Sequence, residues 1–100
     1  MIVRIREEAE KELEQAFDHY EQQREGLGQE FLDEYVRGTH KLVEAPLRWP
    51  TDPVHSQVRR FRLDRFPYVL MYRVEETQCM IIAIAHSKRK PGYWLDRIEP

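Results

Sequence analysis

Three arginines and a histidine in the C-terminal half of the sequence are the residues best suited to chemistry. Arg60 and Arg62 are two residues apart in a strand-like segment, so their side chains would share a face and could hold adjacent phosphate oxygens. His86 ends a long apolar run and is followed closely by Arg89. Ribonucleases that use the 2′-hydroxyl of RNA need proton donors and acceptors, with positive charge around the phosphorane. These four residues could therefore form a metal-independent endoribonuclease site.

The segment after the histidine offers further binding groups. Lys88 and Lys90 add positive charge, and Tyr93 and Trp94 could stack on exposed nucleic-acid bases. Trp94 is instead expected to pin the C-terminal tail to the core, and an ion pair of Arg97 could close that tail. We therefore treat these four lysine and aromatic residues as candidate binding residues.

Each candidate catalytic residue also has a structural interpretation. Arg60 and Arg62 could be ordinary solvated charges on a sheet face, as most exposed basic residues are. His86 could be a hydrogen-bonded residue at a strand end, without a catalytic role. The residue types and spacing leave both interpretations open.

Metal and cofactor sites have no support in the sequence. His19, His40 and His55 are scattered and form neither an H-E-x-x-H motif nor a paired Cys/His spacing. Glycine-rich nucleotide-binding motifs are also absent. The lone Cys79 lies in an apolar run and is expected to be a buried small hydrophobe. We expect no metal and no cofactor.

Length and composition predict a single domain over residues 1–100. The chain has 100 residues, of which 41% are hydrophobic and 34% are charged. Its longest apolar run, residues 79–85, is far shorter than the roughly 20 residues that cross a bilayer. The N-terminal residues lack the features of a secretory signal. We therefore expect a cytoplasmic protein without membrane contact.

The net charge of −2 conceals an asymmetry between the two halves of the chain. Residues 1–54 contain seven Lys/Arg and thirteen Asp/Glu, whereas residues 55–97 contain nine Lys/Arg and four Asp/Glu. The basic half is the part that could meet a phosphate backbone or an acidic protein partner.

The N-terminal half predicts a strand followed by two helices. Alternating residues favour a short strand at 2–6, and an apolar stripe at helical spacing indicates a helix that begins at Glu7. Gly26 and Gly28 are expected to end this helix, and a second helix is expected over 29–44. The short link between the helices predicts an antiparallel helical hairpin.

The C-terminal half predicts three strands after a proline-rich loop. The strands are expected at about 57–63, 68–74 and 78–86, and their short links favour an antiparallel meander. In the last strand Ile82 and Ile84 should share a face, and apolar residues on both faces indicate a central position. The first strand should carry a cationic face.

These features together resemble the RelE/ParE family of toxins from type II toxin–antitoxin systems. The resemblance rests on the turn Phe66-Pro67-Tyr68, the triplet Tyr72-Arg73-Val74, the apolar run ending at His86, and the downstream residues Lys88, Arg89, Pro91, Trp94 and Arg97. It implies an α+β fold in which an N-terminal strand and an antiparallel helical hairpin pack on a curved, mainly antiparallel sheet. The implied order is β-α-α-β-β-β, with a short C-terminal tail.

The resemblance implies two modes of action. RelE-like members cleave messenger RNA on the ribosome, and likeness to them implies phosphate binding by Arg60, Arg62 and Arg89, with His86 as acid or base. ParE-like members poison DNA gyrase. Val69 stands where RelE-like toxins carry an arginine in the middle strand, which removes a charge-assisted contact of about 1.5–3 kcal/mol. The sequence therefore favours the ParE-like branch.

We accordingly expect a toxin that is neutralised by a cognate antitoxin and inhibits DNA gyrase and replication. The first alternative is a RelE-like endonuclease that acts on ribosome-bound messenger RNA. The second is a degenerate toxin that acts only as an antitoxin-binding or regulatory module.

Overall fold

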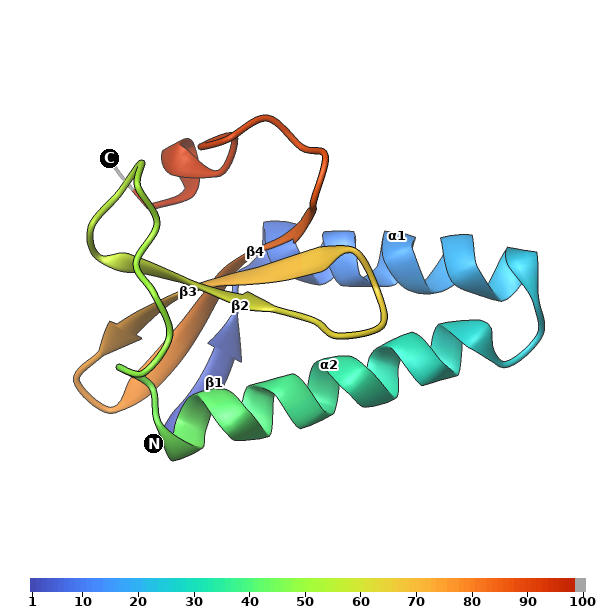
Figure 1. Cartoon of the computed structure of the whole chain (residues 1–100), viewed down its shortest axis with the longest axis horizontal. Coiled ribbons are helices and arrows are strands. Elements are labelled where there is room, and N and C mark those ends of the chain that lie inside the picture. The colour runs from blue at the N-terminus through green and yellow to red at the C-terminus, as the bar shows by residue number, and fades with distance from the viewer. Residues whose placement is uncertain (99–100) are drawn as a thin grey trace.

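The computed structural model describes residues 1–98, which form two long helices and a four-stranded sheet. The elements are β1 (Ile2–Ile5), α1 (Glu7–Gln23), α2 (Leu27–Glu44), β2 (Val58–Arg62), β3 (Tyr68–Glu75), β4 (Gln78–His86) and a short 3-10 helix (Leu95–Arg97). Figure 1 shows the two helices as an antiparallel hairpin beside the sheet. The predicted α+β fold with the order β-α-α-β-β-β is confirmed.

Strand β4 lies inside the sheet, which has the strand order β1-β4-β3-β2. It pairs antiparallel with β3, which pairs antiparallel with β2, while β1 pairs parallel with β4 on the other side. The mainly antiparallel sheet and the central position of the last strand are therefore as expected. Because β4 has layers on both faces, its apolar sequence is buried almost throughout.

A bulge in β4 changes which residues share a face. The pairing with β3 passes from Ile81 to Ala83 and leaves Ile82 without a partner strand residue. Ile82 and Ala83 consequently belong to the same hydrophobic cluster, whereas Ile84 belongs to the cluster beneath the helices. The prediction that Ile82 and Ile84 share a face is wrong, because one inserted residue reverses the alternation.

The sheet separates two hydrophobic clusters. On the helical side, four aromatic rings from α1, α2 and β3 with its preceding turn meet at centroid distances of 4.8–6.1 Å: Tyr20, Phe31, Phe66 and Tyr68. On the opposite side, Met71 and Ile82 pack against Trp94 of the C-terminal segment. Residues 87–98 therefore form a third layer that covers the face of the sheet away from the helices (Figure 1).

The link between the helices is shorter than the glycines alone predict. Helix α2 begins at Leu27, so Gly28 lies inside its first turn instead of ending α1. Gly26 adopts φ +88°, and the Glu21 carboxylate accepts hydrogen bonds from the N–H groups of Gly26 and Gly28 at 2.9 and 3.0 Å. No side chain in the link caps the N-terminal amides of α2. Glu21 of α1 accepts hydrogen bonds from them instead.

Gly28 is required for the contact between the helices. A Cβ at Gly28 would lie 2.8 Å from the Phe17 carbonyl oxygen, whereas one at Gly38 would lie 3.1 Å from the Phe61 ring. We expect Gly28→Ala to lower the free energy of unfolding by about 1–3 kcal/mol, because the backbone of α1 must move. For the matched control Gly38→Ala, the gain in helix propensity of about 1 kcal/mol offsets the tighter contact. In urea unfolding, Gly28→Ala should therefore have a lower midpoint than Gly38→Ala. Equal midpoints would contradict this prediction.

Candidate functional site

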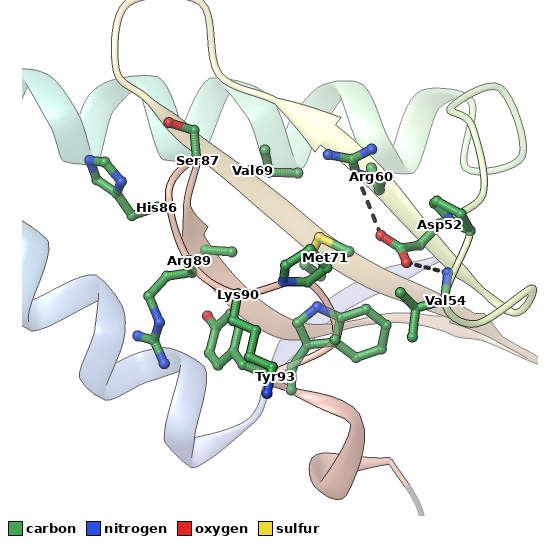
Figure 2. Close-up of a pocket in the computed structure, with 15 residues that line it drawn as sticks. Asp52, Val54, Arg60, Val69, Met71, His86, Ser87, Arg89, Lys90 and Tyr93 are labelled. Atoms are coloured by element: carbon green, nitrogen blue, oxygen red, sulfur yellow. Dashed lines mark hydrogen bonds and ion pairs between the residues drawn. The ribbon is translucent and has the colours of Figure 1, made fainter.

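A cleft of about 200 Å³ lies between the C-terminal segment and the face of the sheet that is directed away from the helices. It brings together six of the eight candidate residues, namely Arg60, His86, Arg89, Lys90, Tyr93 and Trp94. In Figure 2 Arg60 lies on one side of the cleft, and His86 and Arg89 lie on the other. The cleft therefore has cationic walls, and Val69 and Met71 contribute apolar surface between them.

Arg60 is paired with an acidic residue from the proline-rich loop. Its Nε lies 3.6 Å from Oδ2 of Asp52, whose side chain is 10% exposed and also accepts a hydrogen bond from the N–H of Val54 at 2.8 Å. The loop is held in place by backbone bonds to β2, including one from the Arg60 N–H to the Pro50 carbonyl at 2.9 Å. Asp52 thus partly neutralises one cleft wall, and sequence analysis did not identify it.

Two candidate residues lie outside the cleft. Arg62 lines a separate groove between β2 and α2, although it shares a sheet face with Arg60. Lys88 is exposed in the turn after β4, where its backbone N–H donates to Nδ1 of His86 at 3.1 Å. The structure therefore does not bring Arg62 together with Arg60, His86 and Arg89.

His86 is anchored at the end of β4. Its Nδ1 accepts the hydrogen bond from Lys88, which leaves Nε2 to carry the hydrogen of the neutral imidazole. The ring packs edge-to-face on Tyr68 at a centroid distance of 5.1 Å. These contacts fit the structural interpretation of His86, while its place in the cleft wall also keeps Nε2 available for proton transfer.

Arg89 rests on an aromatic ring that is itself fixed by α1. Its guanidinium carbon lies 3.8 Å from the centroid of the Tyr93 ring. The Tyr93 hydroxyl donates to Oε2 of Glu12 at 2.7 Å. Burial and this hydrogen bond raise the pKa of Tyr93, so the phenol remains the donor. Glu12 in α1 therefore holds the ring on which the Arg89 side chain rests.

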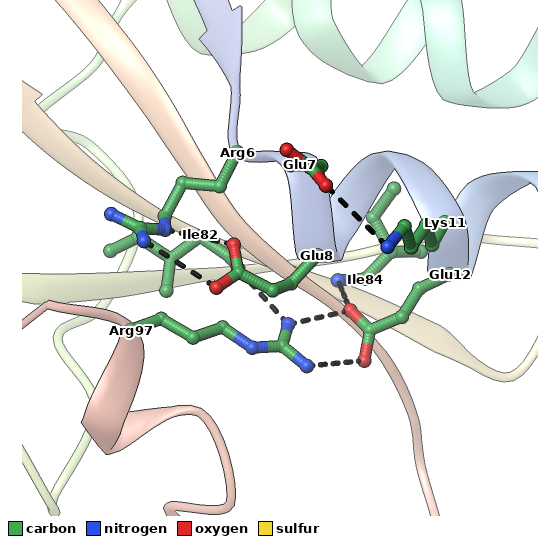
Figure 3. Close-up of polar contacts among 8 residues, drawn as sticks. All are labelled: Arg6, Glu7, Glu8, Lys11, Glu12, Ile82, Ile84 and Arg97. Atoms are coloured by element: carbon green, nitrogen blue, oxygen red, sulfur yellow. Dashed lines mark hydrogen bonds and ion pairs between the residues drawn. The ribbon is translucent and has the colours of Figure 1, made fainter.

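Glu12 forms a clasp with the C-terminal segment, shown in Figure 3. Its carboxylate accepts hydrogen bonds from both terminal nitrogens of Arg97 at 2.9 and 3.0 Å and from the Ile84 N–H at 3.0 Å. Burial disfavours the charged carboxylate, but the bonds from Arg97, Tyr93 and Ile84 outweigh it and lower the pKa of Glu12. We call Glu12, Tyr93 and Arg97 the tail clasp.

The tail clasp also covers an open edge of the sheet. Strand β1 pairs with β4 only as far as Ile81, so beyond that residue the edge of β4 that faces away from β3 has no strand beside it. Glu12 accepts the Ile84 N–H, and Arg97 donates to the Ile82 carbonyl at 3.1 Å. Sequence analysis predicted an ion pair for Arg97 without its partner. The available signal was the position of Glu12, one turn after Ala9 on the buried side of α1.

Trp94 forms part of the floor of the cleft. Only 2% of its surface is exposed, and it packs in the cluster with Val69 and Met71. This burial agrees with the expectation that Trp94 pins the tail to the core, and it leaves no free ring face for a base to stack on. Tyr93 is half-buried, with one ring face occupied by Arg89.

The part of the chain that the structure describes offers neither a metal-binding cluster nor a membrane-spanning helix. Within residues 1–98 no three His, Cys, Asp or Glu side chains are grouped so that they could hold a metal ion. No helix in the same range is long and apolar enough to cross a membrane.

Comparison with known proteins identifies the class of protein that this fold and cleft represent. Residues 3–91 match the family model described as ParE toxin of type II toxin-antitoxin system, parDE. A solved structure titled "Chromosomal ParDE TA system from P. aeruginosa" has the same fold, with a TM-score of 0.75 and 20% identity over 86% of this chain and 95% of that chain. No curated protein sequence matches significantly.

The chain is therefore a toxin of the type II toxin–antitoxin class. More narrowly, it belongs to the ParE toxin family, because the family model covers most of its length. The predicted membership of the RelE/ParE family is confirmed.

Proposed function

We propose that this chain acts by binding DNA gyrase in the cytoplasm and that a cognate antitoxin neutralises it by direct contact. Family membership supports an antitoxin as partner. The choice of gyrase over messenger RNA as the target depends on the cleft.

The observation that favours gyrase over messenger RNA is that Arg62 lies outside the cleft. A phosphate held by Arg60 and Arg62 would need both guanidinium groups to meet at one point, but Arg62 lines a different groove. Arg60 in turn has Asp52 at 3.6 Å, and Val69 offers only buried apolar surface. Positive charge beside apolar surface, without paired proton-transfer groups, suits binding to a protein better than cleavage of RNA.

The exposed residues at the mouth of the cleft are the proposed contacts to gyrase. Lys88 and Lys90 are exposed on the turn that follows β4, and the half-buried Tyr93 follows them closely in the chain. Trp94 would support this surface from below without touching the target. An acidic patch on the partner would match the positive charge of this turn.

One observation favours the alternative of a metal-independent endoribonuclease. Arg60, His86 and Arg89 line the same cleft, and the Nε2 atom of His86 has no protein partner among the described residues. In that case His86 would transfer the proton and the two arginines would stabilise the phosphorane charge.

We expect His86→Ala to retain the full effect of the toxin, with DNA synthesis arrested before protein synthesis. The measurement is pulse labelling of new DNA and new protein in a bacterial host during the first minutes after induction. His40→Ala, which removes an exposed histidine of α2, is the matched control. The wild type, His86→Ala and His40→Ala should also inhibit DNA supercoiling by purified gyrase to the same extent.

Early loss of protein synthesis that disappears in His86→Ala would contradict the proposal and favour RNA cleavage. If the wild-type chain leaves both syntheses and gyrase unaffected while still binding its antitoxin, the degenerate-toxin alternative holds.

A further inference from the structure

A second cationic surface lies along α2 and the end of β2, and it shares no lining residue with the cleft. A groove of about 130 Å³ separates the C-terminal half of α2 from the end of β2 and the turn that follows. Its walls carry Arg37 and Lys41 of α2 and Arg62 of β2, and its floor is formed by Gly38, Phe61 and Leu63. We call it the α2–β2 groove.

The basic residues of this groove are available for a ligand. Arg37 and Lys41 are four residues apart and therefore lie on one face of α2, opposite Arg62. All three are exposed, and none has an acidic partner within residues 1–98. By contrast, Arg60 is paired with Asp52, and Arg65 at the end of the groove is paired with Glu30 at 2.7 Å. The unpaired charges favour an anionic ligand.

The backbone beside the groove favours a peptide as that ligand. The Val58 carbonyl and the Arg60 N–H point away from β3 and are bonded to Asp52 and Pro50 at 2.7 and 2.9 Å. In an antiparallel strand the backbone groups of every second residue face the same way, so the N–H and carbonyl of Arg62 also point away from β3. Residues 50–52 do not extend far enough to bond them. An extended chain could accept and donate hydrogen bonds there.

A buried carboxylate oxygen supports the same conclusion. Glu34 is 7% exposed and lines the groove, where its Oε2 accepts the Arg65 N–H at 2.9 Å. Its Oε1 is buried without a hydrogen-bond partner. Such an atom is costly unless a donor reaches it, and a peptide supplies N–H donors as well as carboxylates.

We infer that the α2–β2 groove binds an extended acidic segment of the antitoxin, whose carboxylates pair with Arg37, Lys41 and Arg62. The inference rests on the proposed function for the source of this segment, but it uses a surface separate from the cleft. A nucleic acid fits less well, because its backbone has no N–H and carbonyl groups to pair with the strand edge at Arg62.

The test uses a fluorescein-labelled octapeptide of alternating glutamate and valine as the probe. Fluorescence anisotropy should show binding that weakens as salt rises, and the double variant Arg37→Glu/Lys41→Glu should raise Kd at least about tenfold. The control Arg4→Glu/Lys11→Glu makes the same change in net charge on exposed residues of β1 and α1, and it should bind almost as the wild type does.

Two further probes make the test specific. An octapeptide N-methylated at alternate residues should bind several-fold more weakly, because it cannot pair with the edge at Arg62. Equal affinity of the glutamate–valine peptide for both double variants would overturn the inference, as would tighter binding of single-stranded RNA of the same charge.

Failure of this inference can be told from failure of the proposed function. The groove variant should still inhibit gyrase supercoiling, because the cleft is unchanged. If the wild-type chain does not inhibit gyrase but the peptide still depends on Arg37 and Lys41, the gyrase proposal fails and the groove assignment stands.

Discussion

Glu12→Gln is expected to lower the free energy of unfolding by about 3–5 kcal/mol, because it leaves the Arg97 guanidinium buried without a countercharge. The two side chains are only 12% and 13% exposed, and their pairing is bidentate. The amide would also present a donor where the carboxylate now accepts bonds from Tyr93 and Ile84. For a domain of this size the loss is a large part of the total stability. Urea unfolding followed by circular dichroism measures it.

The matched control removes both charges. Glu12→Gln/Arg97→Met should be more stable than Glu12→Gln alone, since no unpaired charge is then buried. A double variant no more stable than the single one would show that the clasp works through shape alone.

The same pair gives stability a defined pH dependence. Because the pKa of Glu12 is lower in the folded than in the unfolded chain, its stabilising contribution is complete above the ordinary value of 4.5. The contribution is lost as the pH falls through the lowered, folded-state pKa. Unfolding midpoints of Glu12→Gln should therefore change less than those of the wild type over this acidic range.

Trp94→Ala should have an effect of similar size, about 3–5 kcal/mol, because it removes a large side chain that is only 2% exposed. The lost contacts hold the C-terminal layer against Met71 and Ile82, so the cleft should open as well. Trypsin should cut faster after Lys88 and Arg89, which are exposed in the attached turn.

Trp94→Phe is the control for this change, because it keeps an aromatic ring in the floor and should lose much less stability. Unchanged trypsin cleavage in Trp94→Ala would mean that the tail clasp alone holds the segment in place.

The order and type of the elements were predictable because they follow from local patterns. The apolar stripe that begins at Ala9 and the short links near Gly26 leave few alternatives to a helical hairpin beside a meander. The cleft was predictable only in part. His86 and Arg89 follow the same strand and stay together, whereas spacing along β2 does not show that Arg62 turns toward α2.

The missed features depend on contacts between distant residues. Glu12 meets Arg97 across 85 positions, and its place on the buried side of α1 does not reveal which distant residue it pairs with. Gly28 was expected to end a helix, but the approach of the Phe17 backbone requires it inside α2. The bulge at Ile82 likewise depends on pairing with β3, which an uninterrupted apolar run does not reveal.

The position of β4 in the sheet has a consequence for how the toxin is made. Translation produces β1 first, but its partner β4 is the last of the four described strands to be synthesised. The helical hairpin thus has no complete sheet to pack on until residue 86 has been synthesised, and the clasp needs Arg97 as well. Nascent chains, and chains cut short by stalled translation, therefore lack the finished cleft.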